Sequence, residues 1–222
     1  DKTPRYSLIA EEIIATFPEA KFIVLWRHPL AVASSISSTF RKGRWCPDEF
    51  GIDLHEGQAR LHAFCKKHAA AIHQIRYEDL VTAPVEELRK LGDYLGLDEL
   101  PQVVEQDLVT STGGTLGDPT GVKRYTKISP AGKDAWQKEL SNWYRRAWAR
   151  HYVTGRQAEM MKELGYDFPD EVARGGAPNL LPGLVDCITA KVRIHRRLRK
   201  PTWLPRLAKK FRKEHGYEIS FR

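Results

Sequence analysis

Cysteine is scarce in this chain: among 222 residues there are three, Cys46, Cys65 and Cys187. They are far apart and odd in number, and no CxxC pair or Cys/His cluster has the spacing of a zinc site. A disulfide framework is therefore not expected, and we predict no bound metal. The scarcity of cysteine favours a reducing compartment, so we expect a cytoplasmic protein.

Long apolar runs are also missing. None approaches the roughly 20 residues that cross a bilayer, and no signal peptide stands at the start. Because the sequence opens at Asp1 rather than at a methionine, we expect a fragment whose upstream sequence is free to carry a targeting or membrane segment. With 41% hydrophobic and 29% charged residues and no internal repeat, the composition is typical of one globular domain with an appendage.

Acidic residues are absent from one long stretch near the carboxyl terminus. Residues 191–213 contain eleven Lys or Arg residues and no Asp or Glu. The net charge of the whole chain is +8, so the first 190 residues are close to balanced. A basic balance favours anionic partners such as phosphates, nucleic acid or acidic lipid, without choosing among them.

Hydrophobic periodicity predicts alternating helices and strands. Residues 21–26 form a nearly unbroken apolar run, typical of a buried parallel strand, and 75–77 is a second short candidate. A loop rich in Gly and Thr is predicted at 108–125. Helices are predicted at 7–16, 30–40, 53–73 and 84–95, the last closed by Gly96, and two more within 129–164.

This order of elements predicts an α/β fold with a parallel sheet flanked by helices. From residue 172 the composition changes, and Gly175-Gly176-Ala177-Pro178 is typical of a linker. We therefore predict a domain over 1–170 and a basic helical extension over 171–222.

Arg27 follows the first predicted strand directly, at the carboxyl end where ligands gather in open α/β sheets. The next helix begins behind Pro29, so its free N–H groups and positive dipole end are expected beside this arginine. Ser35 comes eight residues after Arg27, within that helix. A guanidinium and a hydroxyl together suit a phosphate group. From the residues alone, the other interpretation is a solvated or salt-bridged arginine.

Four segments occur in an order that resembles the sulfotransferase family. Arg27 and Ser35 resemble its motif for the 3'-phosphate of the nucleotide. One helix earlier, Asp1-Lys2-Thr3-Pro4-Arg5-Tyr6 resembles the Lys-bearing motif of tyrosylprotein and related bacterial sulfotransferases. Later, 75–81 (IRYEDLV) resembles the Tyr-Glu-x-Leu segment, and 117–128 (GDPTGVKRYTKI) resembles the loop that closes over the nucleotide. The match covers residues 1 to about 168.

The resemblance implies a P-loop-like fold and transfer of a sulfuryl group from 3'-phosphoadenosine 5'-phosphosulfate to an acceptor hydroxyl by in-line displacement. Such catalysis consists of positioning and charge stabilisation. By this resemblance, Lys2 stabilises the leaving bisphosphate, and Ser111 corresponds, with imperfect spacing, to a serine near the transferred group. Arg27 and Ser35 hold the 3'-phosphate, with Ser34 as the alternative if the helix is rotated.

The same resemblance assigns the remaining nucleotide contacts. Tyr77 packs against the nucleotide or hydrogen bonds to it, and a tyrosine satisfied in the core is a comparable interpretation. Lys123 reaches the phosphate or ribose from the late loop, with Arg124 as its competitor. Gly117 and Asp118 shape that loop.

One part of the family pattern is missing. A Gly-rich loop that cradles the 5'-phosphosulfate should precede Lys2, and none follows a strand in this sequence, since Gly113-Gly114 belongs to the late loop. We interpret the chain as truncated, rather than as inactive or completed elsewhere, and expect it to bind the cofactor poorly and without turnover. The general base is expected upstream as well, because His28 is interpreted as a loop residue.

Two other functions stay open. A P-loop-like kinase or other nucleotide transferase would need a GKS/T loop and a Mg²⁺-binding carboxylate after a strand, and neither is found. A non-catalytic basic module would bind an anionic membrane surface or nucleic acid through 190–213. That segment would otherwise dock on the domain and keep its charges in water.

The partners follow from these interpretations. Nucleic acid is not expected, because Trp136, Trp143 and Trp148 with Tyr144 are better explained by core packing than by a stacking platform. The acceptor carries a hydroxyl and is a tyrosine, a carbohydrate or a small metabolite, among which the sequence does not choose.

Overall fold

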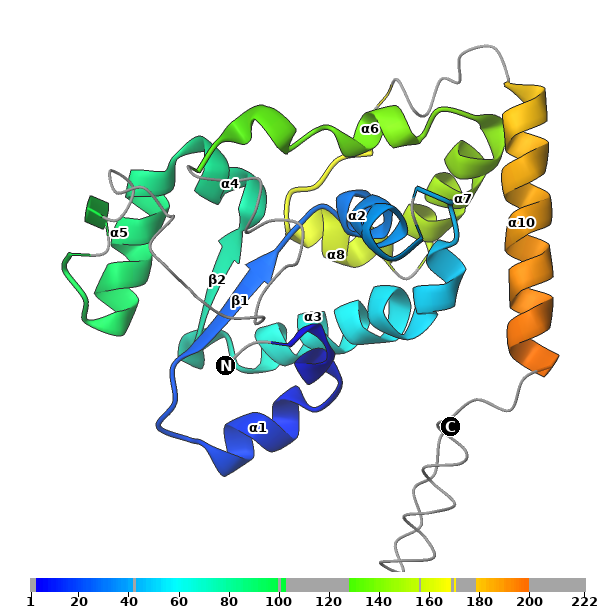
Figure 1. Cartoon of the computed structure of the whole chain (residues 1–222). Coiled ribbons are helices and arrows are strands. Elements are labelled where there is room, and N and C mark those ends of the chain that lie inside the picture. Colours follow the sequence, from blue (N-terminus) through cyan, green and yellow to red (C-terminus); the bar gives the residue numbers. More distant parts are fainter. Residues whose placement is uncertain are drawn as a thin grey trace, which may run out of the picture.

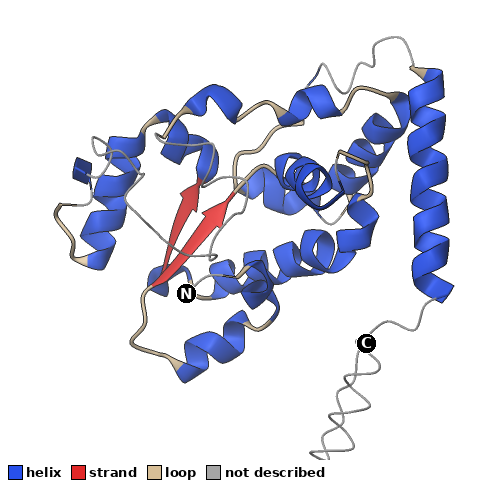
Figure 2. Ribbon diagram, in the orientation of Figure 1, coloured by secondary structure: helices blue, strands red, loops and turns tan. Residues whose placement is uncertain are grey.

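The computed structural model describes residues 3–41, 43–99, 101–102, 128–155, 157–168, 170 and 179–199, with side chains as far as Arg193. Helices surround a short sheet of two strands, and one long helix, α10 (Leu180–Arg199), stands along one edge of the molecule (Figure 1). Figure 2 shows that helices make up much more of this part of the chain than strands do.

The sheet pairs β1 (Phe22–Trp26) with β2 (Ile72–Arg76) in parallel, in a register that runs from Phe22 opposite Ile72 to Trp26 opposite Arg76. Parallel neighbours need a long crossover, and here α2 (Pro29–Arg41) and α3 (Gln58–Lys67) provide it. The predicted α/β arrangement of a parallel sheet flanked by helices is therefore confirmed.

The two faces of β1 differ. Val24 and Trp26 are buried, whereas Ile23 and Leu25 on the opposite face are 46% and 55% exposed. Strands in parallel sheets are usually covered on both faces. The prediction of a buried strand is thus right for one face of β1 and wrong for the other, on which Ile23 and Leu25 stay exposed.

Helices with clear local end signals lie where the sequence predicts them. Helix α2 begins at Pro29, in the position where the fixed φ of proline suits a first turn. Helix α5 (Pro84–Leu95) has the predicted bounds, and Gly96 caps it with φ of 75°, a left-handed conformation that favours glycine.

Other segments that were predicted as single helices contain several shorter elements. The expected helix at 53–73 consists of a π-helical stretch η3 (Ile52–Gly57), α3 and a 3-10 turn η4 (Ala69–Ala71), after which β2 begins. The expected strand at 75–77 is therefore wrong at both ends, because β2 starts at Ile72 and Tyr77 opens helix α4 (Tyr77–Thr82).

The amino-terminal helix and the late helices show the same difference. The predicted helix at 7–16 is interrupted at Ile9, between η1 (Pro4–Leu8) and α1 (Ala10–Thr16). The predicted pair within 129–164 becomes η6 (Pro130–Gly132), α6 (Trp136–Glu139), α7 (Trp143–Thr154) and α8 (Gln157–Glu163). Asn142 causes one break, since its side chain caps α7 by accepting the N–H of Arg145.

The hydrophobic core lies between β1, α2, α3, α7 and α8. Leu30, Leu54, Leu140 and Ala149 are fully buried within it. The carbonyl of Leu54 in η3 accepts hydrogen bonds from Tyr152 Oη at 2.8 Å and Gln157 Nε2 at 2.9 Å, which ties the irregular turn to α7 and α8.

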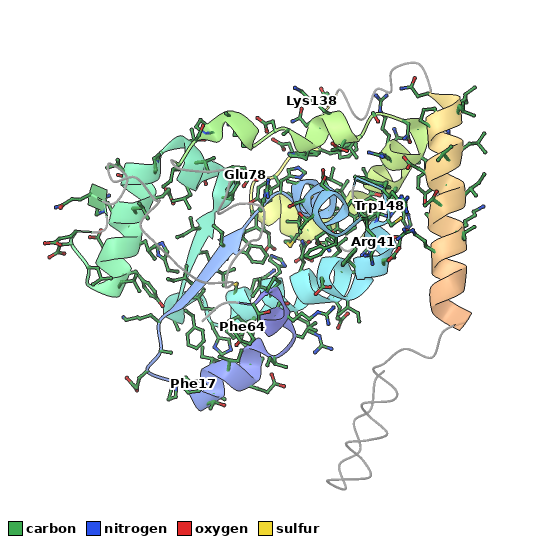
Figure 3. All side chains as sticks on the ribbon, in the orientation of Figure 1. Phe17, Arg41, Phe64, Glu78, Lys138 and Trp148 are labelled. Atoms are coloured by element: carbon green, nitrogen blue, oxygen red, sulfur yellow. The ribbon has the colours of Figure 1, made fainter. Side chains whose placement is uncertain are left out.

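Three of the four aromatic residues predicted to pack in the core do so, whereas the fourth, Trp143, is 38% exposed. Trp136 is buried, and Trp148 packs edge-on against Trp45 with ring centres 5.5 Å apart (Figure 3). Trp143 packs against Tyr144 and under α10. These rings pack against other residues of the protein, which agrees with the interpretation that they are not a stacking platform for nucleic acid.

Helix α10 is held to the domain by polar contacts. Asp186 accepts hydrogen bonds from Arg145 Nε at 2.7 Å and from Asn142 Nδ2 at 2.8 Å. Gly183 lies so close to the indole ring of Trp143 that a Cβ atom there would overlap it. No helix in the described part of the chain is long and apolar enough to cross a membrane. The domain boundary near 170 stays a prediction.

Replacing Asp186 by alanine should lower the free energy of unfolding by about 2 kcal/mol, because Arg145 and Asn142 would each lose a largely buried acceptor. Urea unfolding measures this change. Lys191→Ala, on the exposed side of the same helix, is the control and should change stability by less than about 0.5 kcal/mol. Equal effects of the two changes would show that the Asp186 contacts do not hold α10.

Candidate anion-binding site

The carboxyl ends of β1 and β2 bring Arg27 and Tyr77 together. The parallel register ends on Trp26 and Arg76, so Arg27 and Tyr77 are the next residues of two adjacent strands. The guanidinium carbon of Arg27 lies 4.6 Å from the centre of the Tyr77 ring. A cation in this position over an aromatic face is stabilised by about 0.5–2 kcal/mol. Two residues that were predicted separately thus form one surface.

The guanidinium of Arg27 keeps its hydrogen-bonding capacity. Arg27 is half-buried, and its Nε is buried without a hydrogen-bond partner among the described residues. None of the ion pairs between described residues includes it. A partly buried cation with unused N–H groups is suited to bind an anion. Among the described residues no ion pair supports the interpretation of Arg27 as salt-bridged, and its anion-binding role stays a prediction.

The two acids after Tyr77 are engaged elsewhere. Asp79 pairs with Arg76 at an N–O distance of 3.6 Å. The Oε1 atom of Glu78 accepts the backbone N–H of His28 at 2.9 Å, and its Oε2 atom accepts the hydroxyl of Tyr166 at 2.9 Å. Glu78 thus lies where the strands end (Figure 3) and joins the chain segments that follow β1, β2 and α8.

His28 starts helix α2 as a neutral ring. Its Nδ1 accepts the N–H of Leu30 at 3.2 Å, so Nε2 carries the proton and donates to the carbonyl of Asp167 at 3.0 Å. The ring stacks on Trp136 with centroids 4.3 Å apart. Burial lowers the pKa of His28, although the bond to Asp167 opposes the shift. Both ring nitrogens are occupied, which agrees with the interpretation of His28 as a loop residue.

These contacts show that the amino-terminal end of α2 differs from the prediction. Free N–H groups were expected at the start of α2, but Pro29 has none and the N–H of Leu30 is taken by His28. Val32 donates to the carbonyl of His28. Among the described residues Arg27 is therefore our main candidate for binding an anion here, and this role stays a prediction.

Ser35 lies on the exposed side of α2. Ser34, the alternative, is 5% exposed and faces the core. The exposed hydroxyl of Ser35 can contact a ligand without movement of the helix, whereas the buried hydroxyl of Ser34 cannot. The geometry therefore favours Ser35 over Ser34, and its part in binding stays a prediction.

The other predicted site residues lie outside the described residues. They are Lys2 and Ser111, with predicted catalytic roles, and Gly117, Asp118, Lys123 and Arg124, with predicted nucleotide contacts.

The described sequence and geometry agree with one known family. The family pattern described as "Sulfotransferase family" matches residues 1–102, which include both strands, Arg27, Ser35 and Tyr77. Residues 1–102 of this chain therefore carry the sulfotransferase-family pattern. The nodulation protein NoeE of Sinorhizobium fredii (strain NBRC 101917 / NGR234) is 27% identical to it over 227 residues, which is 91% of this chain and 51% of that protein.

Two solved sulfotransferase domains share the fold. The domain from the curacin biosynthetic pathway superposes with a TM-score of 0.57 at 24% identity and covers 76% of this chain and 62% of its own. The domain from the Synechococcus PCC 7002 olefin synthase gives 0.56 at 26% identity, covering 76% and 58%. The predicted P-loop-like sulfotransferase fold is therefore confirmed. This chain spans about half the length of the curated relative that it matches.

Sequence reasoning missed the residues that support the candidate site. Glu78 stands within the quoted Tyr-Glu-x-Leu segment, but no role was assigned to it. Tyr166, Trp136 and the carbonyl of Asp167 come from distant segments, and no local pattern marks them. They contact His28 and Glu78, and through these two residues they fix the loop that carries Arg27.

Two further features of the structure lie apart from Arg27. A surface depression of 470 Å³ is lined by η6, α6 and the start of α7, including Asp134, Lys138 and Arg146, and contains none of the predicted site residues. In the described part of the chain, no group of three His, Cys, Asp or Glu side chains is arranged to hold a metal.

The stability of this protein should fall as the pH drops below about 6.5, and His28 should contribute to that fall. Because its pKa is lowered by folding, the unfolded chain binds the proton more readily, and acid favours unfolding. One such proton gives a slope of at most about 1.4 kcal/mol per pH unit. Urea unfolding at pH 7.5 and 5.5 should show a smaller fall in stability for His28→Asn than for the unchanged chain. Parallel curves would contradict this account.

Proposed function

We propose that this sulfotransferase takes its sulfuryl group from 3'-phosphoadenosine 5'-phosphosulfate and transfers it to an acceptor hydroxyl. The observation that supports this most is Arg27, a half-buried cation stacked on Tyr77 with its N–H groups unused by described residues. It stands at the carboxyl end of β1, where open α/β sheets bind their ligands.

In this proposal the 3'-phosphate lies against Arg27. The planar guanidinium donates two parallel N–H groups to phosphate oxygens, a geometry that a lysine does not reproduce. Ser35 adds a hydroxyl from α2, and the ring of Tyr77 keeps the guanidinium in place from its other face. Because Glu78 is bound to His28 and Tyr166, it does not compete with the phosphate for Arg27.

The transfer is an in-line displacement between two oxygens. The bond from sulfur to the bridging oxygen breaks and releases adenosine 3',5'-bisphosphate, while a bond forms between sulfur and the acceptor oxygen. The acceptor proton passes to a general base that we do not assign. We propose that Lys2 stabilises charge on the bridging oxygen and that Ser111 lies near the transferred group.

The late loop completes the proposed nucleotide site. Lys123 or Arg124 would contact the phosphate or ribose, in a loop shaped by Gly117 and Asp118. Metal ions have no part in this proposal, since the positive charge comes from the side chains.

A further Gly-rich segment is needed for the 5'-phosphosulfate. We propose that it supplies a strand to the edge of β1 that has no partner among the described residues, and a helix over the apolar face on which Ile23 and Leu25 are exposed. The share of the curated relative that this chain spans, 51%, leaves room for such a segment in a protein of that length.

The acceptor and the compartment stay proposals. A hydroxyl-bearing acceptor, whether a tyrosine, a carbohydrate or a small metabolite, follows from sulfotransferase chemistry. A cytoplasmic location rests on cysteine usage alone.

Arg27→Ala should weaken the binding of adenosine 3',5'-bisphosphate by about 10- to 100-fold, because a charge-assisted hydrogen-bond fork is lost. The same change should leave the weaker binding of adenosine 5'-monophosphate unaltered, since that nucleotide has no 3'-phosphate. Ligand-observed NMR titration measures both affinities even in the millimolar range.

The matched control for Arg27 is Arg89→Ala. Arg89 is an exposed residue of α5 that pairs with Glu86 and Asp93, so the change removes the same charge away from the strand ends. The affinity of the Arg89→Ala variant for adenosine 3',5'-bisphosphate should stay within about twofold of that of the unchanged chain. The proposal fails if Arg27→Ala weakens both nucleotides alike, or neither.

Ser35→Ala should weaken bisphosphate binding by about 3- to 10-fold, the effect of one hydrogen bond to a charged group. Ser38→Ala is the control, because Ser38 is also exposed on α2 and lies nearly one turn further along. The same titration distinguishes them. A loss caused by Ser38→Ala, or none by Ser35→Ala, would remove Ser35 from the phosphate site.

A further inference from the structure

Helix α10 has two chemically opposite faces. The face toward the domain carries small and polar residues, namely Gly183, Asp186, Ala190 and Arg193. Gly183 contacts Trp143, Asp186 binds Arg145, and Arg193 pairs with Glu49 at 3.0 Å. These contacts fix the helix on η2 (Pro47–Phe50) and α7 (Figure 1). The helix is therefore attached through its polar side.

The outward face of α10 is apolar over three turns. Its side chains recur at helical spacing and are 44–74% exposed: Leu181, Leu184, Val185, Ile188 and Val192. Successive residues are rotated by about 100°, so this stripe lies opposite Asp186 and Ala190. A globular helix normally buries its apolar stripe. Here the docking contacts hold that stripe away from the domain.

The charge around the stripe has one sign. The single acid of α10, Asp186, is on the docked face and bound to Arg145. Lys191 is exposed beside the stripe. The sequence from Lys191 to Lys213 adds ten further Lys or Arg residues and no acid. An apolar stripe that adjoins a strongly basic segment is complementary to a surface with an apolar interior and anionic groups above it.

We propose that the outward face of α10 docks this sulfotransferase on an anionic lipid surface. The helix lies in the plane of the interface, with Leu184 and Ile188 among the acyl chains and the basic residues at the head groups. The interaction is peripheral, because α10 is not apolar enough to cross the bilayer. Its docked face keeps the rest of the domain on the aqueous side.

A second copy of the chain fits this face less well. Two copies that met through the stripe would bring two segments with eleven basic residues each into proximity. The outward face of α10 has no acid to neutralise them. Like charges disfavour that contact, whereas anionic lipid head groups favour the lipid surface.

Sedimentation of the full chain with lipid vesicles tests the proposal. The chain should bind vesicles of phosphatidylcholine with one third phosphatidylserine at least about tenfold more tightly than vesicles of phosphatidylcholine alone. The double change Leu184→Gln and Ile188→Gln keeps the charge and should lower the affinity for the mixed vesicles by about tenfold or more. Circular dichroism and urea unfolding check that the variant stays folded.

The matched control is Val85→Gln with Leu97→Gln, which replaces two equally exposed apolar side chains near α5. It should bind mixed vesicles like the unchanged chain. Three results would overturn the proposal: equal binding to both vesicle types, full binding by the α10 variant, or an equal loss in the control. Analytical ultracentrifugation that finds a dimer abolished by the α10 changes, without vesicle binding, would assign the face to a second copy instead.

Discussion

The carboxylate of Glu78 links the three chain segments that meet where the sheet ends. One of its oxygens accepts the N–H of His28 after β1, and the other accepts the hydroxyl of Tyr166 after α8. Because both oxygens are used, the acid does not neutralise Arg27, although the two residues follow neighbouring strands. The guanidinium stacks on Tyr77 instead, and its Nε has no hydrogen-bond partner among the described residues. The proposed phosphate site thus depends on a carboxylate that would not touch the phosphate.

His28 extends the same constraint into the core. Its buried, neutral ring starts α2, stacks on Trp136 and donates to the carbonyl of Asp167. The position of Arg27, one residue earlier, is therefore determined by residues up to 139 positions away in the sequence. At the other edge of the molecule, the polar docking of α10 determines which of its faces is exposed. In both places a satisfied polar contact inside the protein decides what the surface offers to a ligand.

Local signals predicted some elements fully and others not. The proline starts of α2 and α5 and the Gly96 cap act through their own backbone geometry, so those helices lie where expected. The stretch at 53–73 was predicted as one helix because Ile72 continues the apolar stripe, but pairing with Phe22 makes it the first residue of β2. Local periodicity does not register a partner fifty residues away.

The sequence by itself predicted the resemblance to the sulfotransferase family, the α/β order of elements, and Arg27 with Tyr77 as candidate site residues, because each of these follows from contiguous motifs. Tertiary structure decided that Arg27 is left unpaired by the residues described, that Ser34 is buried while Ser35 is exposed, and that α10 turns its apolar side outward. These outcomes depend on which distant groups compete for each hydrogen bond and each buried face. That competition is resolved only when the chain is packed.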